Sequence, residues 1–114
     1  MTYLLQIFNA PALSEYENLS EEDQKAIFGE YMAISQAPGV LGGHQLQPVE
    51  TATTVRVKDG QTLTTDGPFA ETKEAVGGYY LYEADDLDAA IEMAARIPAA
   101  RMGGAIEVRP IVEH

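Results

Sequence analysis

Cysteine and tryptophan are both absent from this chain of 114 residues. Without cysteine the chain can form no disulfide, thiolate nucleophile or cysteine-based metal site, and it fits a reducing compartment. Basic residues are scarce: 7 Lys and Arg stand against 18 Asp and Glu, which gives a net charge of −11. Because so acidic a surface repels phosphate backbones, we expect no nucleic-acid partner.

Long apolar runs are also missing. None approaches the roughly 18 residues that span a bilayer, and no charged leader precedes an apolar segment. We therefore expect no membrane association and a cytoplasmic location. The paired glycines at 42–43 and 77–78 fall in strand-like segments, not in a phosphate loop before a helix, and the internal histidine has no partner at metal-ligand spacing. We expect no cofactor and no metal.

What is present indicates one globular domain over residues 1–114, since 46% of the residues are hydrophobic. Segments rich in β-branched and aromatic side chains predict strands over 2–8, 40–46, 53–58, 61–65, 76–84 and 105–111. Asp59-Gly60 predicts a tight hairpin turn between the third and fourth of these strands.

Two helices are predicted from capping residues and helical spacing. Ser20 is expected to cap a helix that ends before Pro38, and either Asp85 or Asp86 is expected to cap a second helix that ends at Ile97. The apolar stripe of the second helix is predicted to consist of Leu87, Ala90, Ile91 and Ala94.

The resulting order is strand, helix, strand, hairpin, strand, helix, strand. It predicts an α+β, ferredoxin-like βαββαβ fold with an extra β-hairpin. Two helices cover one face of such a sheet, yet the strands at 2–8 and 76–84 are apolar on both faces. A second copy of the sheet is the simplest cover for the other face, which predicts a C₂ homodimer without a stable free monomer.

The loop at 65–74 is the most distinctive stretch. Asp66 has two interpretations: a structural Asx-turn residue, or a general base whose pKa is raised in a cleft. Gly67 permits a positive φ and Pro68 then fixes the chain direction. Phe69 either anchors the loop in the core or stacks on a ligand.

Charged residues continue this loop. Glu71, Lys73 and Glu74 are either a solvated run or a network of ion pairs that ties the loop down. Their partner is predicted to be Arg109, which makes a pair across the dimer conceivable.

Two further residues are candidates for a site. His44 follows two glycines, which would leave its imidazole accessible as an acid or base near neutral pH, although a lone histidine is also a common surface residue. Tyr79 either packs in its strand or lines the cleft with its hydroxyl. The predicted ligand-binding residues are Tyr79 and three residues of the loop, Gly67, Pro68 and Phe69.

The loop also carries a family resemblance. The run Asp66-Gly67-Pro68-Phe69, with Glu71, Lys73-Glu74, Gly77-Gly78-Tyr79 and Glu107-Val108-Arg109-Pro110, resembles the DGPF group of the YCII-related proteins. The resemblance implies a dimeric α+β barrel with clefts, and an association with sigma-factor systems. Some YCII proteins carry a His–Asp pair, but the helix around 28–32 of this chain has no histidine, so that pair is not carried over.

We therefore expect a cytoplasmic homodimer that binds a small, mostly apolar molecule in a cleft beside the Asp66 loop. Any reaction would be cofactor-independent acid–base chemistry, with Asp66 or His44 as the base. The alternative is a non-catalytic regulatory or protein-interaction module, linked to sigma-factor systems, whose acidic surface suits a basic partner.

Overall fold

The structure of the protein, a computed structural model, describes residues 1–9, 19–66 and 75–113. The helices and strands of these residues, in chain order, are β1 (Thr2–Asn9), α2 (Glu21–Ser35), β2 (Val40–Gln45), β3 (Thr53–Lys58), β4 (Gln61–Asp66), β5 (Ala75–Glu83), α3 (Leu87–Arg96) and β6 (Ala105–Pro110). Short 3₁₀ helices, η1 (Val49–Thr51) and η2 (Pro98–Ala100), precede β3 and follow α3.

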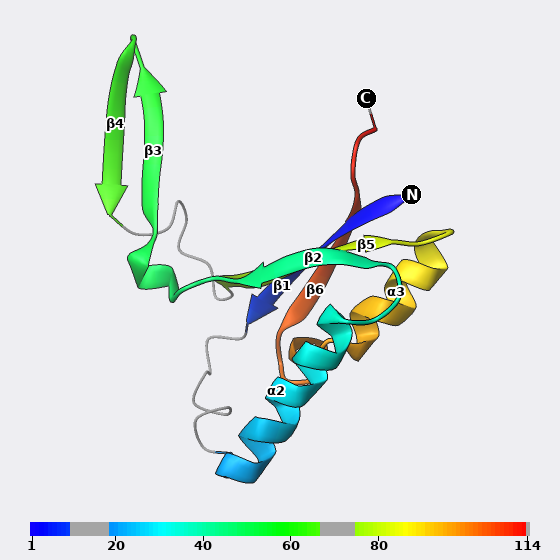
Figure 1. The fold of residues 1–114 in the computed structure, drawn as a ribbon. Helices are drawn as coiled ribbons and strands as arrows, with labels where there is room; N and C mark the ends of the chain where they lie inside the picture. Colours follow the sequence, from blue (N-terminus) through cyan, green and yellow to red (C-terminus); the bar gives the residue numbers. More distant parts are fainter. Residues whose placement is uncertain (10–18, 67–74, 114) are drawn as a thin grey trace.

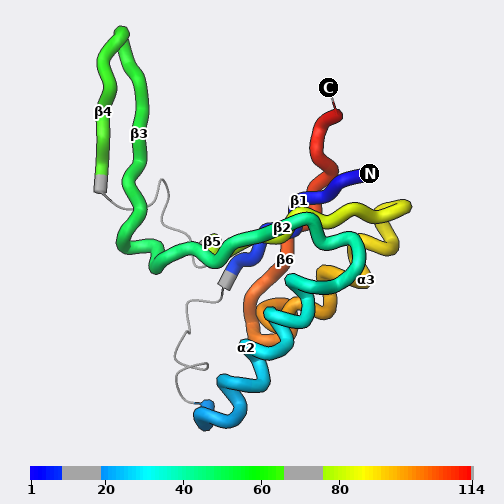
Figure 2. The backbone as a smooth tube through the Cα atoms, viewed as in Figure 1, coloured from blue at the N-terminus to red at the C-terminus, as the bar shows by residue number. Residues whose placement is uncertain are grey.

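Within residues 1–9, 19–66 and 75–113, four antiparallel strands form the main sheet in the order β2-β5-β1-β6, and β3 pairs with β4 in a separate two-stranded sheet. Both helices lie on one face of the main sheet (Figure 1), and the path of the chain is traced in Figure 2. This order is that of a ferredoxin-like fold with a hairpin inserted between its second and third strands. The predicted fold class is therefore confirmed.

Side-chain caps fix the starts of both helices. The Ser20 hydroxyl accepts a hydrogen bond from the Asp23 N–H at 3.1 Å, and the Asp86 carboxylate accepts one from the Ala89 N–H at 2.9 Å. The cap of α3 is thus Asp86, the second of the two predicted candidates. Neither of these helices, in the part of the chain that is described, is long and apolar enough to cross a membrane.

The core lies between the helices and one face of the sheet. Tyr3, Leu5 and Ile7 of β1 are buried there, and Leu5 is completely inaccessible. The Tyr80 hydroxyl donates a hydrogen bond to the Tyr31 carbonyl oxygen at 3.1 Å, which joins β5 to α2. We call this side of the sheet the covered face.

The predicted apolar stripe of α3 is half correct. Ala90 and Ala94 are buried as predicted, but Leu87 and Ile91 are each 49% exposed. Met93 and Ile97 complete the buried side in their place. Both sets fit helical spacing. The tertiary structure decides between them because Ile97 and the η2 turn that follows are buried, which draws the C-terminal end of α3 into the core.

Paired glycines bring β2 close to β5. The register shifts between Val40 and Gly42, which marks a bulge. A Cβ atom at Gly43 would lie 2.4 Å from the Tyr79 carbonyl oxygen, and one at Gly78 would lie 2.8 Å from the His44 carbonyl oxygen. This close approach sets His44 directly opposite Tyr79.

Candidate functional site

The sheet face opposite the core is the candidate site, and we call it the open face. Side chains alternate along a strand, so the residues of β1 between the buried ones point to this side. Leu4, Gln6 and Phe8 are only half-buried there. Within the described residues, the hydrophobic core that holds both helices lies on the covered face.

A row of four polar side chains crosses the open face. His44 of β2 pairs in register with Tyr79 of β5, Tyr79 with Gln6 of β1, and Gln6 with Glu107 of β6. We call these four residues the polar row. Because neighbouring strands lie about 4.8 Å apart, the row spans about 14 Å. The rings of His44 and Tyr79 meet edge to face, with centroids 5.9 Å apart.

Apolar residues flank the polar row on both sides. One register step along the strands, Leu81 pairs with Leu4, and on the other side Val76 pairs with Phe8. Gly42 lies opposite Leu81, and a Cβ atom at this glycine would meet no atom within 4 Å. The open face therefore offers a few hydrogen-bonding groups between apolar surfaces, with free space above Leu81.

Arg109 lies on the open face but far from His44. It belongs to β6, whereas His44 belongs to β2, and these strands are the two opposite edges of the sheet. The Arg109 guanidinium donates to the Glu107 carboxylate at 2.5 Å, with the two side chains 72% and 43% exposed. Its predicted partners Glu71, Lys73 and Glu74 lie outside the described residues, so the cross-dimer network stays a prediction.

Asp66 is placed by its backbone. It ends β4, opposite Thr53 in the hairpin register. Its side chain lies outside the described part of the structure, as do Gly67, Pro68 and Phe69. Both interpretations of Asp66 therefore stay predictions.

Sequence reasoning missed Gln6 and Glu107 as members of the site. A signal for Gln6 was available, because its amide interrupts the otherwise apolar run from Leu4 to Phe8. What no local pattern reveals is the register, which aligns Gln6 with residues 73 and 101 positions later in the chain.

The polar row provides several hydrogen-bond donors and acceptors. An imidazole, a phenol, an amide and a carboxylate can together hold a polar group of a ligand, and the imidazole can take up or release a proton. Among the described residues, no group of three or more His, Asp or Glu side chains is arranged to hold a metal ion. The four side chains of the polar row offer hydrogen bonding and proton transfer.

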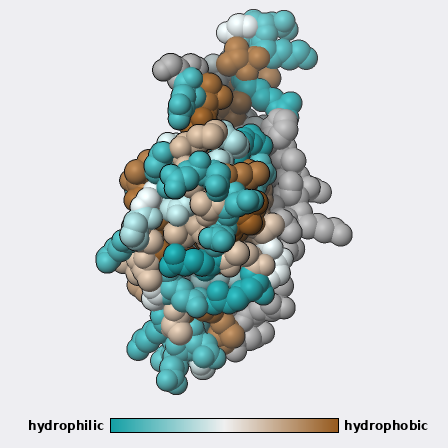
Figure 3. Space-filling view, turned by 90° about the vertical axis from the view of Figure 1, so that its right-hand side faces the viewer, coloured by the Kyte–Doolittle hydropathy of each residue, from teal (hydrophilic) through white to brown (hydrophobic). Residues whose placement is uncertain are grey.

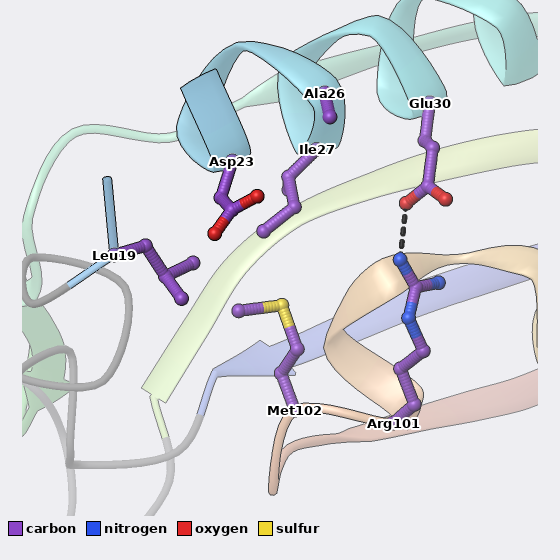
Figure 4. Close-up of a pocket in the computed structure, with 7 residues that line it drawn as sticks. All are labelled: Leu19, Asp23, Ala26, Ile27, Glu30, Arg101 and Met102. Carbon is purple, nitrogen blue, oxygen red and sulfur yellow. Dashed lines mark hydrogen bonds and ion pairs between the residues drawn. The ribbon is translucent and has the colours of Figure 1, made fainter. Parts of the chain in front are cut away.

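A separate hollow of about 350 Å³ lies between the first turns of α2 and the turn after η2 (Figure 4). Ile27 and Met102 form its apolar middle, and an ion pair between Arg101 and Glu30 closes one end. Its full lining is Leu19, Asp23, Ala26, Ile27, Glu30, Arg101 and Met102. The hollow contains no residue of the polar row.

Comparison with known proteins identifies relatives. The profile of the YCII-related domain matches residues 4–114, which is nearly the whole chain. An uncharacterised protein of Rhizobium meliloti (strain 1021) is 36% identical over 97 residues, covering 81% of this chain and 78% of that protein. The sequence resemblance and the ferredoxin-like fold agree with these matches. The chain belongs to the YCII-related family.

Proposed function

We propose that this protein is a cytoplasmic homodimer that binds a small, mostly apolar molecule on the open face of its sheet. The observation that carries the proposal is the polar row, with His44 against Tyr79, set between apolar rows. Sites for small molecules typically combine apolar walls with a few well-placed polar groups. The lack of cysteine supports a reducing location.

The dimer follows from the same face. Leu4, Phe8 and Leu81 are apolar and only half-buried there, and a second copy would bury them and enclose the polar row. Sedimentation at micromolar concentration tests this step. A folded monomer under those conditions would contradict it.

Chemistry on this face would be cofactor-independent proton transfer. His44 or Asp66 is the base, and Tyr79 and Gln6 hold the polar group of the substrate. We expect His44→Gln or Asp66→Asn to abolish turnover while ligand binding and the fold persist. Loss of the fold in Asp66→Asn would instead assign that residue a structural role in its turn.

A thermal-shift screen with a library of small metabolites tests ligand binding. Compounds that stabilise the wild type are then measured with Gly42→Leu, which fills the free space above Leu81. We expect this variant to weaken binding at least tenfold. The matched control is Gly29→Leu on α2, where a Cβ atom also meets nothing within 4 Å, and it should bind as the wild type does.

Two results would overturn the binding proposal. One is a screen in which no compound stabilises the wild type. The other is a ligand that binds Gly42→Leu and the wild type equally well, because that ligand lies elsewhere on the molecule.

A second candidate function is a non-catalytic regulatory or interaction module, linked to sigma-factor systems. It is favoured by large apolar side chains on the outside of α2: Phe28 is 60% exposed and Met32 is 45% exposed. Exposed apolar residues that lie together are typical of protein-binding surfaces, and a net charge of −11 would attract a basic partner. A negative metabolite screen would favour this function over the first.

A further inference from the structure

The β3–β4 hairpin stands apart from the rest of the chain. Among the residues that the structure describes, its two strands pair with each other and with no further strand, and their main contacts are with each other. Of residues 53–65, every one except Thr54 is exposed. Figure 1 shows the hairpin projecting from the sheet on the side away from α2 and α3.

The dimensions of the chain reflect this projection. The radius of gyration is 16.0 Å, and the extents are 47 × 42 × 19 Å. A compact chain of this length has a radius of gyration of about 13 Å. The excess fits a hairpin that projects from the rest of the described residues.

One face of the hairpin carries two exposed valines. The register sets Val55 and Val57 opposite Thr64 and Thr62, all on one face, and the two valines are 59% and 70% exposed. Figure 3 shows apolar side chains reaching the surface on the hairpin, above the body of the molecule. A lone two-stranded hairpin is marginally stable in water, and exposed β-branched strands invite aggregation. A surface that buries Val55 and Val57 would therefore stabilise the hairpin and protect it from aggregation.

We propose that the hairpin is an arm that packs, through Val55 and Val57, on the open face of a second copy of this chain. Each binding site is then completed by residues of both chains. The proposal rests on the homodimer proposed above, and it adds which residues of the second copy enter the site.

Three observations identify the occupant as a second copy. First, the hairpin lies on the side of the sheet away from the helices (Figure 1), which is the side of the open face. Two copies packed open face to open face would therefore each set their hairpin alongside the other's sheet. The half-buried Leu4 and Leu81 supply apolar surface for the valines.

Second, the hairpin enlarges the surface that two copies can share. With strands about 4.8 Å apart and a rise of about 3.3 Å per residue, a four-stranded face of this length has a flat footprint of roughly 500 Å². A stable interface buries about 800 Å² of accessible surface on each partner. An arm from each copy adds contact area beyond the sheets themselves.

Third, the hairpin lacks the acidity of the rest of the chain. Its two basic residues, Arg56 and Lys58, balance Asp59 and Asp66, whereas the whole chain carries −11. An arm without net charge meets less repulsion at a second acidic copy than the acidic body does.

The first test removes the apolar contact and keeps the strand. Val55→Thr/Val57→Thr retains side-chain shape and β-propensity, and we expect the dimer dissociation constant to rise at least tenfold by analytical ultracentrifugation. The matched control is Leu63→Thr, which removes an apolar side chain, 45% exposed, from the opposite face of the hairpin. It should change the constant less than threefold.

Two results would overturn the arm and leave the homodimer in place. In one, the double variant has the same dimer dissociation constant as the wild type. In the other, Leu63→Thr raises this constant as much as the double substitution does. A wild type that is monomeric at micromolar concentration overturns the homodimer itself. The two failures are therefore distinguishable.

A second test does not depend on the folding of the double variant. Because the chain has no cysteine, Val57→Cys in one chain and Leu4→Cys in a size-tagged chain can be cross-linked by a short bis-maleimide. We expect rapid formation of the mixed cross-linked pair. Val57→Cys mixed with Ile91→Cys, on the outside of α3, is the control, and equal yields in the two mixtures would overturn the arm.

Discussion

The two faces of the main sheet are built from the same four strands and differ in almost everything else. On the covered face Tyr3, Leu5 and Ile7 are buried against the helices, and the Tyr80 hydroxyl is hydrogen-bonded. On the open face, alternate residues of the same strands form the polar row between apolar neighbours. Packing within one chain therefore lies mainly on the covered face, which leaves the open face available to a ligand or to a second copy.

The largest expected effect is a loss of stability on the covered face, which is shown by comparing two neighbouring leucines. Leu5 is fully buried on the covered face, so Leu5→Ala should lower the free energy of unfolding by about 2–5 kcal/mol. Leu4 is half-buried on the open face, so Leu4→Ala should lower the free energy of unfolding by only about 1 kcal/mol. Urea denaturation at one protein concentration measures both, and equal losses would contradict the division between the faces.

The next largest effect is a difference in stability between alanine substitutions at two neighbouring glycines. Gly43→Ala drives a Cβ atom against the Tyr79 carbonyl oxygen, so β2 and β5 must separate, and we expect a loss of about 1–3 kcal/mol. At Gly42 the space is open, and Gly42→Ala should change stability by less than about 0.5 kcal/mol. Thermal unfolding distinguishes the two, and a neutral Gly43→Ala would refute the close approach of these strands.

The smallest effect concerns pH on the covered side. Burial raises the pKa of the Tyr31 phenol, because the phenolate would lose hydration. The folded protein thus holds this proton more tightly than the unfolded chain, whose tyrosines titrate near pH 10. The resulting stabilisation is complete below about pH 10 and is lost as the pH rises through the raised folded value.

We therefore expect the unfolding free energy of the wild type to fall more steeply above about pH 10 than that of Tyr31→Phe. Urea unfolding at a series of alkaline pH values measures both slopes. Parallel slopes would show that Tyr31 titrates alike in the folded and unfolded states.

Local signals in the sequence predicted much of the fold. Ser20 and Asp86 cap their helices because each carries an oxygen that satisfies a free backbone N–H, an interaction confined to one turn. Asp59 and Gly60 both have positive φ, as the predicted tight turn requires. The stripe of α3 was predicted correctly at Ala90 and Ala94 but not at Leu87 and Ile91, because two overlapping sets of residues satisfy the same helical period.

Candidate site residues divide in the same way. His44 and Tyr79 were singled out by residue type and neighbours, and the structure brings them into ring contact. The separation of Arg109 from His44 could not be predicted, because it depends on which strands become the edges of the sheet. The loop after Asp66 lies outside the described residues, and its role stays a prediction.

By itself the sequence determined the elements, their order and the family, since capping, alternation and turn chemistry act over a few residues. Only the tertiary structure decided the register of the sheet, which helix face is buried, and which residues share the open face. Strand pairing joins residues far apart in the chain, such as Gln6 and Glu107, and depends on the packing of all the elements together. The polar row exists only because of that pairing.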